Sequence, residues 1–326
     1  MKNGSAFLAA MVCMINVSAA PTDALRRRAA LQQQAASGPA AVPALLEGLK
    51  DENVVVRRTA ARLLTRITPL PVNALATALT NSDGLVRRLA ISTLVRTPEL
   101  DPTPYLETAL SDPSPALRLN ATQRLAALSP RTPQVTALLA RARQDRDNTV
   151  ARTAAQALWT FHRSTKRLSE RPDWDYEVRT VKTIPLPAEG WHFRVDPRAE
   201  GHLEKWFRPE LDDSSWRTIA IEQAWQKAGV EYTGVSWYRR SVDLPAKPEL
   251  NATEIRFEGV DESTWVWVNG VYVGDHDIGP DGWNEPFSID VTAEIKWGAT
   301  NQITVRAMST QGNGGIWKPV SIQALK

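Results

Sequence analysis

The segment TWVWVNGVYV, residues 264–273, carries the strongest structural signal in the sequence. Asn269-Gly270 separates two runs of β-branched and aromatic residues, and this pattern predicts a β-hairpin because both turn residues accept positive φ. Further short strands are predicted at 237–244, 254–259, 287–291, 302–308 and 317–324. No helical periodicity separates these runs, so the region is predicted to form an antiparallel β-sandwich of the jelly-roll type.

The composition of the chain changes well before this hairpin. Residues 21–170 carry 21 Lys and Arg against 12 Asp and Glu, whereas residues 171–326 carry 17 against 24. The net charges are therefore +9 and −7, and eleven of the twelve tryptophans lie after residue 170. Two halves that differ this much predict two domains.

The first half contains a repeat of about 30 residues. Four segments align on an apolar residue followed by arginine, with steps of 30, 31 and 34 residues between Arg57, Arg87, Arg118 and Arg152. Three and seven positions after each Arg, apolar residues fall on one helix face: Ala60 and Leu64, Ala90 and Leu94, Ala121 and Leu125, Ala155 and Trp159. Acidic residues that can accept hydrogen bonds from a helix start precede each Arg: Asp51, Asp83, Asp112 and Asp147. A shorter helix ahead of each turn is predicted to begin at Pro43, Pro71, Pro104 and Pro133.

This pattern resembles short HEAT repeats over about residues 22–162, with residues 23–34 as a capping helix closed by Gly38. The resemblance implies a curved α-solenoid whose units bury their apolar faces only by stacking, and which offers a surface to partners without performing chemistry. It also implies that the repeat arginines pair with the Asp of a neighbouring turn. The remaining basic residues fit either a solvated face, which is the commoner arrangement, or a patch for an anionic partner.

Motifs in the second half occur in the order found in the sugar-binding domain of family 2 glycoside hydrolases. They are DDSSW (212–216), GVSWYRR (234–240), FEGVD (257–261), VWVNG (266–270), NQITVR (301–306) and GGIWKPV (314–320). The resemblance covers about residues 185–326 and implies a galactose-binding-like jelly roll. Trp216, Trp237, Trp265 and Trp267 are motif or strand residues and are expected in the core.

In that family the domain accompanies a catalytic (β/α)₈ barrel of about 250 residues. The sequence ends at Lys326, directly after the jelly roll, so we expect no barrel and none of the family's catalytic residues. Two carboxylate pairs, Asp212-Asp213 and Asp261-Glu262, are interpreted as turn caps and solvated loop charges. Adjacent residues of an extended strand point to opposite faces, so the carboxylates of Asp261 and Glu262 are not expected to converge on a substrate.

The N-terminus has the features of a signal peptide: Lys2, an apolar run at 6–17 and small residues up to Ala19. We therefore expect a secreted or periplasmic protein. Cys13 is the only cysteine, so the processed chain is expected to lack disulfides and thiol-based sites. The predicted organisation is a signal peptide (1–19), HEAT-like repeats (20–162), a linker (163–184) and a galactose-binding-like β-sandwich (185–326).

Three loops of the predicted sandwich are rich in aromatic and polar residues, at 224–234, 275–285 and 311–317. Sugar recognition needs a flat ring against the C–H face of a sugar and planar groups for its hydroxyls. If the loops converge, Trp225, Tyr232, Trp283 and Trp317 are the candidate platforms. Asp281, Asn284 and Asn313 are then the candidate hydroxyl partners.

Three functions are compatible with the sequence. The leading hypothesis is a non-catalytic accessory protein that binds a glycan or oligosaccharide through the sandwich and a protein partner through the repeats. A structural or assembly protein of the cell envelope is the first alternative, and a hydrolase related to family 2 glycoside hydrolases is the second. We expect no cofactor, no metal site, no nucleic-acid partner and no transmembrane segment, since no motif of these kinds is present.

Overall fold

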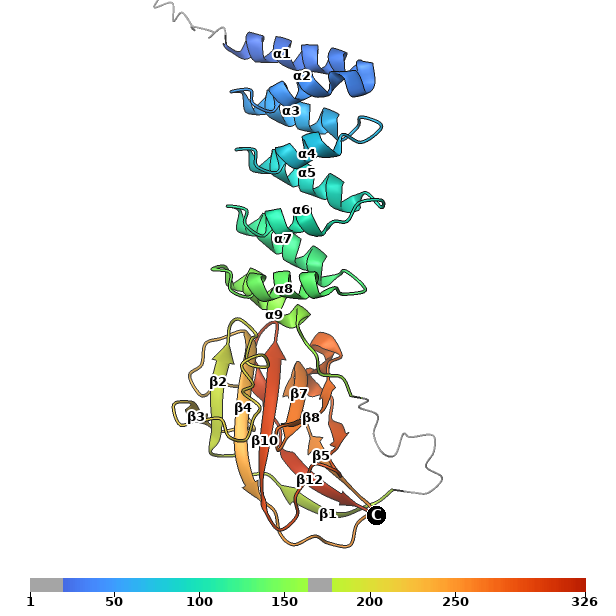
Figure 1. Cartoon of the computed structure of the whole chain (residues 1–326). Coiled ribbons are helices and arrows are strands. Elements are labelled where there is room, and N and C mark those ends of the chain that lie inside the picture. Colours follow the sequence, from blue (N-terminus) through green and yellow to red (C-terminus); the bar gives the residue numbers. More distant parts are fainter. Residues whose placement is uncertain (1–19, 164–177) are drawn as a thin grey trace, which may run out of the picture. The chain divides into compact units, whose positions relative to one another are not determined.

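The structure, a computed structural model, describes residues 20–163 and 178–326. The predicted signal peptide and most of the predicted linker lie outside the described residues. The chain divides into two compact units, Met1–Leu125 and Ala126–Lys326. The described part of the first unit is helical, and the second unit joins the last two helices to an antiparallel β-sandwich (Figure 1).

Shorter and longer helices alternate through the first three repeats, as the sequence predicts, whereas both helices of the last repeat have ten residues. A capping helix comes first, and the short 3₁₀ segment after it contains Gly38 at φ +60°. The bounds are α1 (Ala20–Gln34), η1 (Ala35–Ala41), α2 (Val42–Gly48), α3 (Val54–Leu64), α4 (Val72–Ala78), α5 (Gly84–Arg96), α6 (Thr103–Ala109), α7 (Pro115–Ala126), α8 (Pro133–Ala142) and α9 (Asn148–Ala157). The predicted small residues, Ala60, Ala90, Ala121 and Ala155, are all buried where successive helices pack.

The predicted helix starts are confirmed for the prolines and for two of the four acidic residues. Prolines begin or cap the first helix of each repeat, where a missing N–H costs nothing. Asp83 and Asp147 cap α5 and α9 by accepting hydrogen bonds from the amides of Leu85 and Thr149, both at 2.9 Å. In two other repeats the acidic residue, Asp51 or Asp112, lies two positions earlier in the turn and accepts from the amide two residues ahead.

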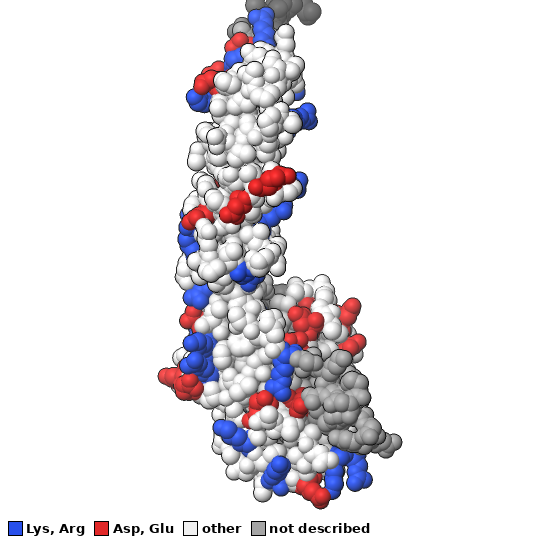
Figure 2. Space-filling model, turned by 45° about the vertical axis from the view of Figure 1, so that its right-hand side comes forward, with Lys and Arg blue, Asp and Glu red and all other residues white. Residues whose placement is uncertain are grey.

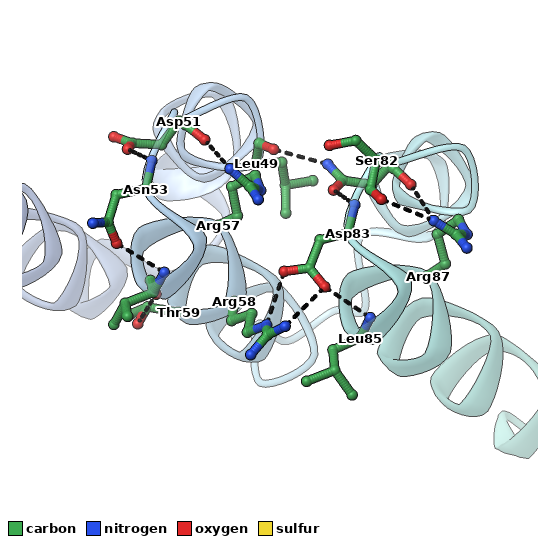
Figure 3. Close-up of polar contacts among 12 residues, drawn as sticks. Leu49, Asp51, Asn53, Arg57, Arg58, Thr59, Ser82, Asp83, Leu85 and Arg87 are labelled. Atoms are coloured by element: carbon green, nitrogen blue, oxygen red, sulfur yellow. Dashed lines mark hydrogen bonds and ion pairs between the residues drawn. The ribbon is translucent and has the colours of Figure 1, made fainter. Parts of the chain in front are cut away.

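Charged side chains of both signs are interspersed on the face of the helical repeats that Figure 2 shows, without a continuous basic area. Some of these charged residues form ion pairs that connect neighbouring repeats. Ion pairs link one repeat to the turn of the next, with Nε–Oδ2 distances of 2.7, 2.8 and 2.7 Å in Arg27–Asp51, Arg58–Asp83 and Arg87–Asp112. Figure 3 shows the second of these pairs together with the Asp83 cap.

The assignment of this bracing to the repeat arginines is right for Arg87 and wrong for Arg57. The Arg57 guanidinium donates to the carbonyls of Asp51 and Glu52 in its own turn, at 2.7 and 2.8 Å (Figure 3). Its neighbour Arg58 reaches the next repeat instead. Arg87 does both, because it also donates to the carbonyl of Asn81 in its own turn. The repeat position therefore fixes the hydrogen bonds within the turn, whereas the ion pair to the next repeat is made by Arg87 itself in one case and by the neighbouring Arg58 in the other.

The β-sandwich consists of a four-stranded and a six-stranded sheet, with a short two-stranded ribbon beside them. The strand orders are β1-β12-β5-β9, β3-β2-β4-β10-β7-β8 and β11-β6, and the pairings are antiparallel throughout. The bounds are β1 (Thr180–Pro185), β2 (Trp191–Asp196), β3 (Arg217–Ile219), β4 (Gly234–Asp243), β5 (Ala252–Phe257), β6 (Val260–Asp261), β7 (Ser263–Val268), β8 (Val271–His276), η3 (Gly279–Asn284), β9 (Phe287–Asp290), β10 (Thr300–Ser309), β11 (Gly315–Ile316) and β12 (Val320–Leu325). β1 lies in the stretch for which the sequence predicted a linker.

The predicted hairpin is present as β7 and β8, with Asn269 at φ 52° and Gly270 at φ 82°. Both faces of the six-stranded sheet are covered. Val266 and Val268 of β7 face the core between the sheets, whereas Trp265 and Trp267 face an aromatic cluster on the other side. Alternate residues of a strand point to opposite faces, so a strand that is apolar throughout is buried on both.

The last repeat belongs to the same compact unit as the sandwich. Trp159 takes the repeat position that Leu64, Leu94 and Leu125 occupy, but α9 ends at Ala157, so the prediction that this Trp continues the helix face is wrong. Its ring packs against Trp265, with centroids 5.8 Å apart. Arg143, after α8, also pairs with Glu204 of the sandwich at 3.0 Å. Opposite charge and aromatic packing thus join the final helices to the sheet.

Candidate functional site

The three loops singled out in the sequence converge at one end of the sandwich. The Gln226 amide donates to the carbonyl of Gly312 at 3.2 Å and accepts from the amide of Gly314 at 3.1 Å, which ties the first loop to the third. The indole N–H of Trp317 donates to the carbonyl of Trp283 at 2.6 Å, which ties the third loop to the second. Segments far apart in sequence therefore share one surface.

A groove of about 410 Å³ lies where these loops meet. A volume of this size is within the range of small-molecule sites, about 300–1,000 Å³. Its walls combine two indole rings with acidic, basic and amide groups, a mixture that suits polyhydroxylated ligands. The lining residues are Glu222, Gln223, Ala224, Lys227, Asp261, Trp283, Asn313, Gly314 and Trp317.

The two tryptophans of the groove form a stacked pair. Their ring centroids are 5.4 Å apart and the ring planes differ by 22°. The Lys318 ammonium lies 4.5 Å from the Trp317 ring centroid and donates to Asn284 Oδ1 at 2.6 Å. Trp317 is therefore engaged by two neighbours, whereas Trp283 is 49% exposed and is the ring with an open face.

The carboxylate best placed to accept a ligand hydroxyl is that of Asp261. It is half-buried in the groove wall, and this burial, reinforced by the charge of Glu262, raises its pKa to about 6. Glu262 is buried away from the groove and accepts a hydrogen bond from the Thr310 hydroxyl at 2.7 Å. The other groove carboxylate, Glu222, is exposed. The interpretation of Asp261 as a solvated loop charge is therefore wrong, because part of its surface is desolvated.

The predicted site residues divide into two groups. Trp283, Trp317 and Asn313 line the groove, and Asn284 lies next to it through Lys318. Trp225 is 0% exposed, so its ring has no face to offer a ligand. Tyr232 packs against the core between the sheets, and Asp281 is exposed in η3 outside the groove wall. The polar residues that the sequence reasoning missed are Glu222, Gln223, Lys227 and Asp261.

Trp225 is buried behind the groove wall and packs against the third loop. Its indole N–H donates to the Tyr232 carbonyl at 2.9 Å, and its backbone N–H donates to the Gly314 carbonyl at 2.9 Å. A Cβ on Gly314 would lie 2.1 Å from the Trp225 ring, so only glycine allows the third loop to pass this close. Gly314 therefore serves a close backbone approach. Trp225 thus shapes the groove without lining it.

The two acidic residues of the DDSSW motif have structural partners. Asp213 accepts from the buried Arg239 at 2.6 Å and is 2.8 Å from His192 Nδ1. Asp212 caps the next turn by accepting from the Ser214 amide at 3.1 Å. Within residues 20–163 and 178–326, no group of three or more His, Cys, Asp or Glu is placed to hold a metal ion. None of the helices in those ranges has the length and apolarity needed to cross a membrane.

Comparison with known families places these features in context. Residues 186–317 match the family described as glycosyl hydrolases family 2, sugar binding domain. Residues 41–70 match the HEAT repeat, and residues 72–159 match the model described as HEAT repeats. The chain thus carries N-terminal HEAT repeats followed by a family 2 sugar-binding domain.

Several curated relatives share the second half. A β-glucuronidase of Formosa agariphila is 26% identical over 156 residues, which are 48% of this chain and 13% of the relative. A β-galactosidase of Thermoanaerobacter pseudethanolicus is 38% identical over 98 residues, or 28% and 13% of the two chains. The mouse β-glucuronidase is 29% identical over 138 residues, or 37% and 20%. The match therefore spans only a small part of each relative's length.

Two solved structures are similar to part of this chain. A glycosyl hydrolase family 2 member from Bacteroides cellulosilyticus is 23% identical, with a TM-score of 0.37, and the match covers 45% of this chain and 21% of that one. A Ruminococcus gnavus β-glucuronidase, solved in complex with an N1-substituted uronic isofagomine, is 18% identical with a TM-score of 0.39. That match covers 48% and 31% of the two chains.

Proposed function

We propose that the chain is an exported accessory protein that binds carbohydrate, without cleaving it, in the groove lined by Trp283 and Asp261. The observation that carries the proposal is the open face of Trp283, at the edge of a groove whose wall also carries polar side chains able to bind hydroxyls. The match to a sugar-binding domain and the signal-like N-terminus support it. The HEAT repeats serve as the scaffold for a second macromolecule.

The chemistry of recognition follows from the groove. The C–H face of a sugar ring packs on Trp283, and hydroxyls donate to Asp261 and Glu222 or exchange hydrogen bonds with Asn313. Trp317 stacks on the Trp283 ring and donates to the Trp283 carbonyl, and Lys318 packs on the Trp317 ring. A shallow site with one open ring is expected to bind at a Kd of about 1 mM, which corresponds to about −4 kcal/mol.

The test is a glycan array followed by calorimetry of the full chain with the sugars that bind. Trp283→Ala is expected to weaken binding at least about tenfold, a loss of about 1.4 kcal/mol, because the stacking surface is removed. Binding is also expected to weaken as pH falls through 6, since the Asp261 carboxyl is then protonated and loses acceptor capacity.

Ile278→Ala is the matched control, because Ile278 lies in the same loop, is 50% exposed and does not line the groove. It is expected to leave sugar binding unchanged. Failure of every glycan to bind, or equal affinity of the Trp283→Ala protein, would contradict the proposal. Hydrolysis of aryl glycosides that is lost in Asp261→Asn would favour the hydrolase alternative instead.

A specific feature of the first unit supports the scaffold role. A groove of about 610 Å³ is lined by four arginines from α3, α5 and α7: Arg58, Arg88, Arg96 and Arg124. Arg58 pairs with Asp83. The other three form no ion pair with any residue in the described part of the chain. A groove with three unpaired cations and the polar side chains of Ser92 and Asn120 suits an acidic polypeptide.

Poly-glutamate is the probe for this groove. The variant Arg88→Glu/Arg96→Glu/Arg124→Glu is expected to lose binding at least about tenfold, and the affinity of the wild-type chain is expected to fall with added salt. The control variant Arg26→Glu/Arg62→Glu/Arg66→Glu changes the charge by the same amount at exposed positions outside the groove. Equal loss in both variants would show attraction by net charge alone and would contradict a defined site.

A further inference from the structure

A second cavity in the unit formed by residues 126–326 has no part in the sugar groove. Its volume is about 390 Å³, and it lies between the segment after α9 and the strands β7, β8 and β10. Aromatic rings form its walls, and a buried cation and two carboxylates line it. The residues that matter here are Trp159, Trp265, Asp275, Asp277 and Arg306.

Arg306 is the unusual member of this set. It is only 3% exposed, and its guanidinium carbon lies 4.1 Å from the Trp265 ring centroid and 5.3 Å from that of Trp159. Its Nε is buried without a hydrogen-bond partner. The guanidinium forms no ion pair with a carboxylate in residues 20–163 or 178–326.

Arg239, on the adjacent strand β4, is a buried arginine whose guanidinium does have hydrogen-bond acceptors. Arg239 is 1% exposed and donates to Asp213 at 2.6 Å and to the carbonyl of Trp206 at 2.5 Å. Burying a charge without an acceptor is costly, and stacking on indole rings recovers only part of that cost. Arg306 therefore presents donors that the described residues leave unused, beside a cavity large enough for a ligand.

The carboxylates of the cavity limit the kind of ligand. Asp275 accepts from the Tyr272 hydroxyl, and Asp277 accepts from the Ser263 hydroxyl at 2.7 Å. Each retains acceptor capacity toward the cavity. A simple anion on Arg306 would be repelled by these two carboxylates. A ligand that carries both a negative group and hydrogen-bond donors can pair with Arg306 and also donate to Asp275 and Asp277.

The nearby histidine adds no second positive charge. His202 is buried against Trp159, with ring centroids 4.9 Å apart. Burial, reinforced by the charge of Arg306, lowers the pKa of His202 to about 4. The imidazole is therefore neutral at pH 7, and Arg306 keeps the only buried positive charge among the residues that line this cavity.

We propose that this cavity binds a small carboxylate whose acid group forms a forked ion pair with Arg306 and whose other end donates hydrogen bonds to Asp275 and Asp277. The indole rings of Trp159 and Trp265, together with Met308, contact the apolar part of the ligand. A guanidinium matches a carboxylate with two parallel hydrogen bonds, which gives both strength and orientation. The donor end is either the ammonium of an amino acid or the hydroxyls of a hydroxy acid.

The test uses calorimetry of the full chain with two matched pairs, leucine against leucinamide and gluconate against sorbitol. One or both acids are expected to bind, at least about tenfold tighter than the matched neutral-headed compound, because only the acid pairs with Arg306. Binding of leucine alone identifies the ammonium as the donor end, and binding of gluconate alone identifies hydroxyls. Failure of both acids to bind at about 10 mM, well above the Kd of a weak specific site, would overturn the proposal.

Arg306→Met is the decisive variant, because Met keeps the length and removes the charge. Acid binding is expected to be lost, while the thermal midpoint without ligand stays unchanged or rises, since an unpaired buried charge has been removed. Arg306→Lys keeps the charge but not the fork and is expected to bind the acid at an intermediate affinity. Trp283→Ala leaves this cavity intact and is expected to retain acid binding, which separates the result from that of the sugar groove. A lowered midpoint in Arg306→Met, together with undiminished acid binding, would show that Arg306 is structural only.

Discussion

Trp267→Ala is expected to destabilise the unit formed by residues 126–326 by about 3–5 kcal/mol, a large share of the stability of an ordinary domain. Trp267 is 0% exposed and stacks on Trp237 and Phe207, with centroids 5.1 and 5.4 Å away. It also contacts Phe161 after α9, at 5.4 Å. Removing the ring leaves a cavity between the sheet and the segment that joins it to the helices. Urea unfolding followed by tryptophan fluorescence measures the loss.

Trp283→Ala is the matched control, because it removes the same side chain from a half-exposed position. It is expected to shift the unfolding midpoint far less, since little buried surface is lost. If the two variants unfolded at the same urea concentration, the aromatic cluster would not be a second core. Hydrogen exchange of α9 gives an independent readout, because loss of Trp267 is expected to increase exchange there more than in β5 or β12, which lie in the other sheet.

The helical repeats were predictable because their determinants are local. Helix starts depend on Pro and Asp within one turn, and the buried columns recur every 30 or so residues. The ion pairs between repeats were less predictable, because they join residues 24 or 25 positions apart. Whether Arg57 or Arg58 reaches the next repeat depends on the helix orientation, which the sequence pattern does not specify.

The sandwich was predictable where β-branched and aromatic runs flank a clear turn signal, as in the hairpin around Asn269. Strands β1, β2, β3, β6 and β11 were missed, because they are short or interrupted by charged residues. The second core on the outer face of the six-stranded sheet was also missed. Its signal was present, since β7 is buried at each of its six positions, and such a run indicates a strand covered on both sides.

The candidate groove was predictable to the level of its loops but not of each residue. Composition located the three loops, and Trp283 and Asn313 lie where the prediction requires. Trp225 was assigned wrongly to the ligand platform, because the sequence does not distinguish a loop tryptophan that is exposed from one that is buried. What fixes it inward is Gly314, 89 residues away, which leaves room for the ring. Asp261 was missed because its partial burial depends on the packing of the other loops.

Asp112→Ala is expected to destabilise the first unit by about 3–5 kcal/mol, because it leaves Arg87 partly buried without its partner. The Asp112 side chain is almost fully buried and accepts from Arg87 at 2.7 and 2.9 Å and from the Ser114 amide at 2.7 Å. Burial would raise the pKa of Asp112, but the hydrogen bonds from Arg87 and Ser114 and the nearby positive charges lower it below its usual value. Thermal unfolding followed by circular dichroism measures the loss.

The lowered pKa fixes how this stabilisation depends on pH. The folded state holds the Asp112 proton more weakly than the unfolded state does, so the contribution is complete above the usual pKa of about 4 and is lost as pH falls below it. The difference in midpoint between wild type and Asp112→Ala is therefore expected to be constant from pH 8 to 5 and to shrink toward pH 3. Glu47→Ala, which breaks only an exposed pair with Lys50, is the control and is expected to show little difference at any pH. A difference that stayed the same down to pH 3 would mean that Asp112 acts by packing and not through its charge.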